Sequence, residues 1–202
     1  MKPTKVLIVC SETKLDLHQY QNYYKIGVER GCLALINTFN QIDLLCCDQD
    51  SLQDDDLVLI KSKAKTILEI SQVKDYIDGE IAIQEALKLN PTEIVLIAQG
   101  RRFDMELSCL NFIYRYNVIF INDYTYAYLL QPGMNEVIAK PDYRYFSLFA
   151  LQDATVTITN LKYNVENLLL RQLSSNAISN EFVSSSGNVE VLSGQVVAIY
   201  SK

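Results

Sequence analysis

The stretch EIVLIAQGRRFDME, residues 93–106, joins an apolar run to a polar turn and then to a helical pattern. Residues 94–98 are continuously apolar, which is typical of a strand buried on both faces of a sheet. Gly100 ends this run, and two arginines precede a helix that we expect over 104–115. This unit predicts an α/β sheet.

The same alternation extends over the first two thirds of the chain. Strands are expected at 6–9, 43–47, 93–98 and 118–122, and helices over 15–25, 27–38, 76–89 and 104–115. Apolar strands separated by amphipathic helices predict an α/β N-terminal domain with a mostly parallel sheet and helices on both of its faces.

The texture of the sequence changes after about residue 124. Short β-type runs follow one another, with Pro-Gly, Ser-Gly-Asn and Ser-Gly turns between them. This pattern predicts an all-β, sandwich-like C-terminal domain. We place the boundary at Gln131-Pro132-Gly133, giving domains 1–130 and 131–202.

Composition narrows the classes of function. The 202 residues are 49% hydrophobic, enough for real cores, and carry 18 basic against 24 acidic side chains, a net charge of −6. That balance argues against nucleic acid or an anionic membrane as a partner. The first apolar run is too short for a signal sequence or a membrane span, so a cytoplasmic protein is expected.

The metal-binding and nucleophilic side chains are few. One histidine, His18, excludes a His-rich metal site and disfavours a Ser-His-Asp triad. Five cysteines without a C-x-x-C pair indicate reduced thiols. The remaining candidates for catalytic groups are therefore carboxylates, lysine and arginine side chains, hydroxyls or a bound metal.

Four aspartates form a candidate metal site. Asp48 and Asp50 follow the strand 43–47, and Asp75 and Asp78, three residues apart at a predicted helix start, share a face. Together they favour a hard divalent cation such as Mg²⁺. Capping of the helix is the alternative for Asp75 and Asp78. The run 54–56 is expected to face water.

A third polar group follows the strand 93–98. Gly100 allows close backbone approach, and the guanidinium groups of Arg101 and Arg102 suit a polyphosphate at a helix start. A solvated turn is the alternative for this arginine pair.

The order of these motifs resembles the thiamine pyrophosphokinase family over nearly the whole chain. The segments IGVERGCLALI, IDLLCCDQDS, KDYID, GRRFD, FSLFAL, NLKYNV and ISNEF carry the resemblance. The family's D-F-D-S, K-D-x-T-D and G-G-R-x-D-H elements match residues 48–51, 74–78 and 100–105.

The resemblance implies a fold, an activity and partners. The fold is an α/β nucleotide domain followed by a β-sandwich, in a homodimer with thiamine bound between the subunits. The reaction transfers diphosphate from ATP to the thiamine hydroxyl and requires Mg²⁺.

The resemblance also assigns roles to individual residues. Metal binding falls to Asp48, Asp50, Asp75 and Asp78, which with Arg102 are the catalytic residues, and ATP binding to Lys74, Gly100, Arg101, Arg102 and Asp104. Tyr163 would stack on thiamine, and Ser179 or Asn180 would bond its aminopyrimidine. The alternative is that Tyr163 belongs to the sandwich core and that ISNEF is a bulged strand.

Several positions depart from the family pattern. These are Cys10-Ser11, Glu29, Gln49, Ile77, Arg101 and Met105. Ile77 in place of threonine removes a hydroxyl near the phosphates. Two other functions therefore stay open: a catalytically weakened thiamine- or nucleotide-binding protein, or a Mg²⁺-dependent phosphotransferase with a different alcohol acceptor.

Overall fold

The computed structural model describes residues 4–47, 54–71, 74–99 and 102–202. The chain forms two compact units. The first comprises Met1–Phe112 and Val118–Asp123, and the second comprises Ile113–Asn117 and Tyr124–Lys202. Within the described residues, no helix combines the length and the apolar composition needed to cross a bilayer.

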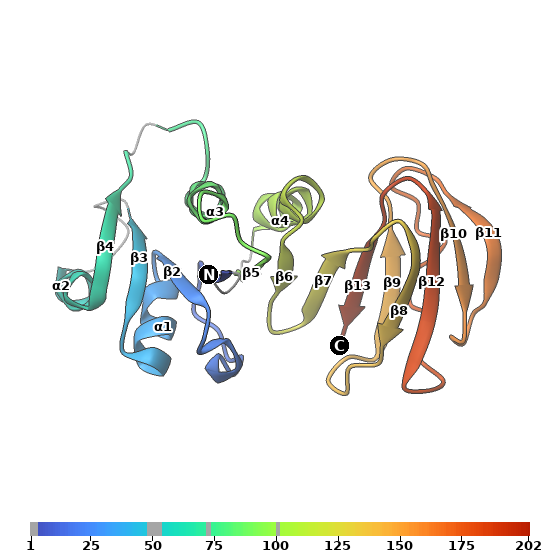
Figure 1. Ribbon diagram of the computed structural model, residues 1–202, viewed down its shortest axis with the longest axis horizontal. Helices are drawn as coiled ribbons and strands as arrows, with labels where there is room; N and C mark the ends of the chain where they lie inside the picture. The colour runs from blue at the N-terminus through green and yellow to red at the C-terminus, as the bar shows by residue number, and fades with distance from the viewer. Residues whose placement is uncertain (1–3, 48–53, 72–73, 100–101) are drawn as a thin grey trace. The chain divides into compact units, whose positions relative to one another are not determined.

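The first unit is built on a parallel sheet (Figure 1). Its strands lie in the order β4-β3-β2-β1-β5-β6, and each neighbouring pair is parallel. Their bounds are Lys5–Val9 (β1), Tyr24–Val28 (β2), Ile42–Cys47 (β3), Ala64–Glu69 (β4), Glu93–Ile97 (β5) and Ile119–Ile121 (β6). The predicted parallel α/β sheet is confirmed.

Helices cover both faces of this sheet. They are the 3-10 helix His18–Tyr20 and the α-helices Gly31–Phe39 (α1), Asp54–Lys63 (α2), Asp78–Leu87 (α3) and Phe103–Tyr116 (α4). The chain adds β2, β3 and β4 on one side of β1 and then returns to add β5 on the other side, and α1 and α3 lie on opposite faces of the sheet, as Figure 1 shows. Every residue of β3 is buried, as expected for a strand covered on both sides.

The predictions for the two helices nearest the N-terminus were partly wrong. The helix expected over 15–25 is instead a short 3-10 helix followed by β2, and the helix expected from residue 27 begins at Gly31. Lys25 made β2 look amphipathic. It is buried, with its Nζ donating to the carbonyls of Gln21 and Tyr23, both at 2.8 Å, and lying over the Phe39 ring. Because a lysine is normally exposed, a buried lysine in this strand conceals the buried pattern from an analysis of sequence periodicity.

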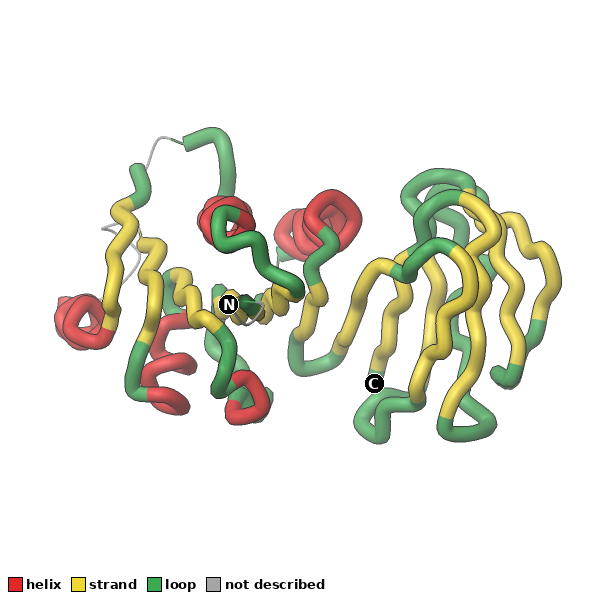
Figure 2. Tube along the Cα trace, in the orientation of Figure 1, coloured by secondary structure: helices red, strands yellow, loops and turns green. Residues whose placement is uncertain are grey.

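The second unit is entirely strand and loop from β7 onward. All residues from Thr125 to Lys202 are described, and none is helical (Figure 2). Two antiparallel groups form: β7-β13-β9 and β11-β10-β12-β8. The bounds are Thr125–Leu129 (β7), Gly133–Ile138 (β8), Tyr145–Phe149 (β9), Ala154–Thr159 (β10), Val165–Leu170 (β11), Ser186–Ser193 (β12) and Val197–Ser201 (β13).

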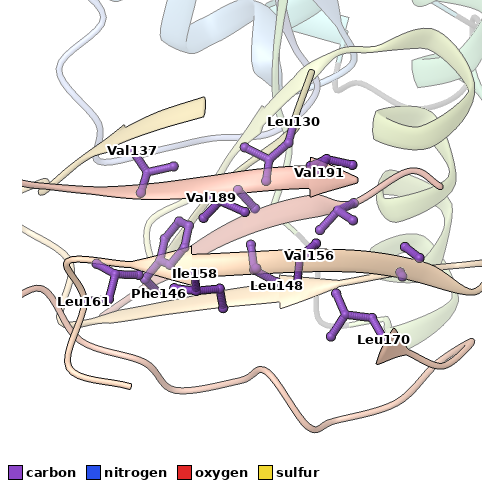
Figure 3. Packing of buried hydrophobic residues seen from close by; sticks show 14 of the residues in the cluster. Leu130, Val137, Phe146, Leu148, Val156, Ile158, Leu161, Leu170, Val189 and Val191 are labelled. Atoms are coloured by element: carbon purple, nitrogen blue, oxygen red, sulfur yellow. The ribbon is translucent and has the colours of Figure 1, made fainter. Parts of the chain in front are cut away.

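Both strand groups of the second unit contribute to one hydrophobic core. Phe146 and Leu148 of β9 pack with Val156 of β10 and Val189 of β12, all at most 1% exposed (Figure 3). This shared core confirms the predicted sandwich-like domain. Pro132, where the sequence places the domain boundary, lies between β7 and β8, which begins at Gly133, and both strands belong to the second unit.

Candidate functional site

A cavity of about 280 Å³ opens beside the carboxyl ends of the central strands of the first unit. The segments that follow β1, β2 and β5 line it, together with the N-terminal turns of α3 and α4, which is where open parallel sheets bind ligands. The lining residues are Cys10, Val28, Glu29, Ile77, Asp78, Gly79, Leu96, Ala98, Gln99, Arg102, Met105, Cys109 and Phe112.

Close backbone packing shapes the β1 and β2 side of this cavity. A Cβ on Gly31 would lie 2.1 Å from the carbonyl oxygen of Val9, so only glycine lets α1 start so close to β1. Glu29, two residues earlier, has a positive φ of 45°. The chain therefore turns sharply from β2 into α1, which puts Glu29 on the cavity wall.

Asp78 is the buried carboxylate of the cavity. It is the first residue of α3 and is 8% exposed, and its charge lies at the positive end of the helix dipole. The Lys74 ammonium forms an ion pair with its Oδ1 atom. Apart from this ion pair, Asp78 Oδ1 has no hydrogen-bond partner among the described residues. A buried carboxylate oxygen in this state is suited to a cation.

The other predicted metal ligands are placed differently. Asp75 is exposed and lies in a bend before α3, which begins at Asp78, so the predicted sharing of one helical face was wrong. Asp48 and Asp50 lie outside the described residues. Within residues 4–47, 54–71, 74–99 and 102–202, no three acidic, histidine or cysteine side chains form a metal cluster. The four-aspartate cluster stays a prediction.

Arg102 brings the positive charge to the cavity lining. It precedes α4, which starts at Phe103, one residue before the predicted start. Its Nε and Nη2 donate to the two carboxylate oxygens of Asp104, at 3.2 and 2.5 Å. This bidentate bond raises the pKa of Arg102 and lowers that of Asp104. Gly100 and Arg101 lie outside the described residues.

Two cysteines line the cavity: the sequence analysis assigned no role to Cys109 and named Cys10 only as a departure from the family pattern. All five cysteines are free thiols, as expected. Burial raises the pKa of Cys109 to about 12, so its thiol stays protonated at neutral pH and acts as an apolar wall group. The position of Cys10 directly after the predicted strand 6–9 was the one feature of the sequence that could have placed it at the cavity.

The candidate thiamine residues lie in the second unit. Tyr163 is 56% exposed, so the alternative that it belongs to the sandwich core is wrong. Ser179 is exposed and has a positive φ of 59°. Asn180 is 6% exposed, and its side-chain amide bonds to the backbone of Tyr163.

In a comparison with known proteins, both units of the chain match domain models of the same family. Residues 17–122 match the model of the thiamin pyrophosphokinase catalytic domain, and residues 135–196 match that of the thiamin pyrophosphokinase vitamin B1 binding domain. The chain belongs to the thiamin pyrophosphokinase family.

Individual members of the thiamin pyrophosphokinase family have low sequence identity to this chain but closely similar folds. Thiamine pyrophosphokinase of Bacillus subtilis is 24% identical over 184 residues, which are 87% of this chain and 86% of that protein. Its crystal structure matches with a TM-score of 0.89 over 98% of this chain and 99% of its own, at 23% identity. Thiamin pyrophosphokinase from Geobacillus thermodenitrificans matches with a TM-score of 0.86 at 25% identity, over 98% of each chain.

Proposed function

We propose that this protein is a thiamine pyrophosphokinase that converts ATP and thiamine into AMP and thiamine diphosphate. The observation that carries the proposal is the match of both units, in order, to the catalytic and vitamin B1 binding domains of one family. The cavity at the strand ends supports it, because that position suits a nucleotide.

The residues present fit a divalent cation. Asp78 has a buried carboxylate whose Oδ1 atom is paired with the Lys74 ammonium and has no other hydrogen-bond partner in the described part of the chain, and a carboxylate oxygen is a hard ligand. Asp78 would hold Mg²⁺ together with Asp75 and with Asp48 and Asp50. A bound Mg²⁺ would neutralise phosphate charge.

Arg102 and Lys74 are the proposed phosphate-binding side chains of the described chain. Arg102 is exposed at the cavity, and its two hydrogen bonds to the carboxylate oxygens of Asp104 fix the orientation of its guanidinium group. Asp104 thereby limits the entropy that Arg102 loses on binding phosphate. Lys74 carries its charge next to Asp78, where it balances a carboxylate that burial would otherwise destabilise. Gly100 and Arg101 complete the proposed ATP site.

The proposed reaction is an in-line displacement at the β-phosphorus of ATP. The thiamine hydroxyl oxygen forms a bond to this phosphorus, and the bond between the β-phosphorus and the oxygen that bridges to the α-phosphorus breaks, releasing AMP. The hydroxyl proton passes to a carboxylate, for which exposed Asp75 is our candidate. Such transfers depend on positioning and electrostatics, so a histidine base is not required.

The acceptor site is proposed in the second unit. The exposed ring of Tyr163 would stack on thiamine, in a homodimer that binds thiamine between subunits. Of the two candidates for bonding the aminopyrimidine, Ser179 and Asn180, the exposed Ser179 is the one proposed to contact it. Family membership of residues 135–196 supports thiamine as the acceptor. We expect the enzyme to work in the cytoplasm.

The test is product stoichiometry. The purified protein is incubated with Mg²⁺, ATP and thiamine, and AMP and thiamine diphosphate are quantified together against a control without thiamine. Equal amounts of the two products, both dependent on thiamine, are expected. ATP turnover that requires another alcohol would contradict the proposal and indicate a different phosphotransferase.

Ile77 favours one competing function, a thiamine-binding protein that has lost catalysis. Ile77 occupies the N-cap of α3 and lines the cavity, and it provides no side-chain cap for the helix. Thiamine binding by calorimetry without any product would establish this competing function. Restoring a hydroxyl with Ile77→Thr would then be expected to raise turnover.

A further inference from the structure

An exposed tyrosine in the second unit is tied to a buried asparagine seventeen residues later. The Asn180 Nδ2 donates to the Tyr163 carbonyl oxygen at 2.8 Å, and the Tyr163 N–H donates to Asn180 Oδ1 at 3.0 Å. The N–H of Glu181 donates to the same Oδ1 at 2.9 Å. One side chain therefore fixes both backbone polar groups of Tyr163.

These bonds use most of the hydrogen-bonding capacity of Asn180. An amide oxygen accepts two hydrogen bonds, and both are taken by backbone N–H groups, so at most one amide N–H is left for a ligand. The side chain is also nearly inaccessible, at 6% exposure, whereas Tyr163 is 56% exposed. Asn180 is badly placed to contact a substrate, and Tyr163 is well placed.

Asn180 is itself anchored to the core of the sandwich. Its N–H and carbonyl oxygen bond the carbonyl oxygen and N–H of Phe146, at 2.9 and 2.8 Å, and Phe146 in β9 is fully buried. Phe146 lies between the two strand groups in Figure 3. A continuous series of bonds thus runs from a rigid core strand through Asn180 to the backbone of an exposed aromatic ring.

A second, weaker connection lies beside the first. The Lys162 N–H donates to the Glu181 carbonyl oxygen at 2.9 Å, and the Lys162 ammonium pairs with the Glu181 carboxylate at 2.6 Å and lies 5.4 Å from the centre of the Tyr163 ring. This ion pair is partly exposed, so water weakens it. The buried amide of Asn180 is the stronger restraint.

We propose that Asn180 is a positioning residue: it holds the Tyr163 backbone so that the exposed ring is preorganised to stack on an aromatic ligand. The proposal rests on the proposed function for the identity of that ligand, the thiamine ring system. Preorganisation lowers the entropy that the Tyr163 segment loses on binding, so Asn180 strengthens binding without contacting the ligand.

A spectroscopic experiment tests the restraint without any substrate. The chain contains no tryptophan, so Tyr163→Trp supplies a single indole reporter at the position in question, excited at wavelengths that the tyrosines do not absorb. Time-resolved anisotropy is measured in this variant alone and combined with Asn180→Ala or with the nearly isosteric Asn180→Asp. Faster local motion of the indole is expected in both combinations. Asn176→Ala, at an exposed asparagine four residues earlier, is the matched control and should leave the anisotropy unchanged.

A kinetic experiment then separates positioning from direct contact. In the otherwise unchanged enzyme, Asn180→Asp is expected to raise the KM for thiamine about tenfold, with the KM for ATP and the kcat little changed. In a Tyr163→Ala background the same change should have almost no further effect, because its target is gone.

The outcomes are distinguishable. Unchanged indole anisotropy in both Asn180 variants, with circular dichroism showing a folded protein, would overturn the positioning role. A thiamine effect that persists fully in the Tyr163→Ala background would overturn it too, and would make Asn180 a direct ligand. If the enzyme makes no thiamine diphosphate, the proposed function fails, while the anisotropy experiment still decides whether Asn180 restrains residue 163.

Discussion

The two units present their candidate residues in opposite ways. In the α/β unit, Asp78 is 8% exposed and sits in a cavity beside a lysine ion pair, whereas in the β unit Tyr163 is 56% exposed and is held through its backbone. Burial strengthens electrostatic interactions with a cation or phosphate. An exposed ring on a restrained backbone provides an apolar stacking surface at low entropic cost. From this comparison we expect the α/β unit to bind the charged groups of the reaction and the β unit to bind the aromatic ring.

The largest effect is expected when the buried charge of Asp78 is removed. Asp78→Asn should lower kcat at least about 100-fold, because a carboxylate that faces the developing phosphate chemistry is replaced by a neutral amide. The melting temperature should fall as well, because the neutral amide no longer balances the charge of the Lys74 ammonium at this buried position. The kcat is measured from AMP release, with thermal unfolding measured in parallel.

Asp142→Asn is the control for this prediction. It removes one exposed carboxylate from the second unit and should leave both kcat and stability unchanged. A fully active Asp78→Asn variant would remove Asp78 from the metal site and would break the division between the two units.

An intermediate effect is expected at the exposed ring. Tyr163→Ala should raise the KM for thiamine roughly 5- to 150-fold, which corresponds to about 1–3 kcal/mol for one stacked ring. The conservative Tyr163→Phe keeps the ring and should behave like the unchanged enzyme. Steady-state kinetics at saturating ATP measures both. An equal loss in the two variants would show that the hydroxyl, not the ring, provides the binding energy.

The smallest effect concerns the exposed pair Arg102–Asp104. The hydrogen bond from Arg102 lowers the pKa of Asp104 below its ordinary value of 3.8. A carboxyl with a lowered pKa stabilises the folded state above the unfolded-state pKa, and this contribution is lost as the pH falls through the folded-state value. Both side chains are exposed, so the loss should be slight.

An NMR titration of the Asp104 carboxyl checks this pH dependence. In Arg102→Gln the pKa of Asp104 should return toward 3.8. A pKa that stays equally low without Arg102 would assign the shift to the helix start instead.

The sequence by itself determined the fold class and the division of the chain into an α/β part followed by an all-β part. A continuous apolar run such as residues 94–97 needs burial on both faces, and a parallel sheet covered by helices provides it. The motif order also led to the family, which the matches of both units confirm. These features follow from local patterns of apolar residues and motifs, which can be identified in a single sequence.

Tertiary structure alone decided the details that depend on distant contacts. β2 was hidden because Lys25 is buried against Phe39 and the carbonyls of residues 21 and 23. The burial of Asp78 and the exposure of Asp75 differ because α3 starts at Asp78 and leaves Asp75 in the preceding bend. Asn180 restrains Tyr163 across seventeen residues because the sandwich core anchors it through Phe146. Burial and long-range hydrogen bonds arise only when the chain is folded.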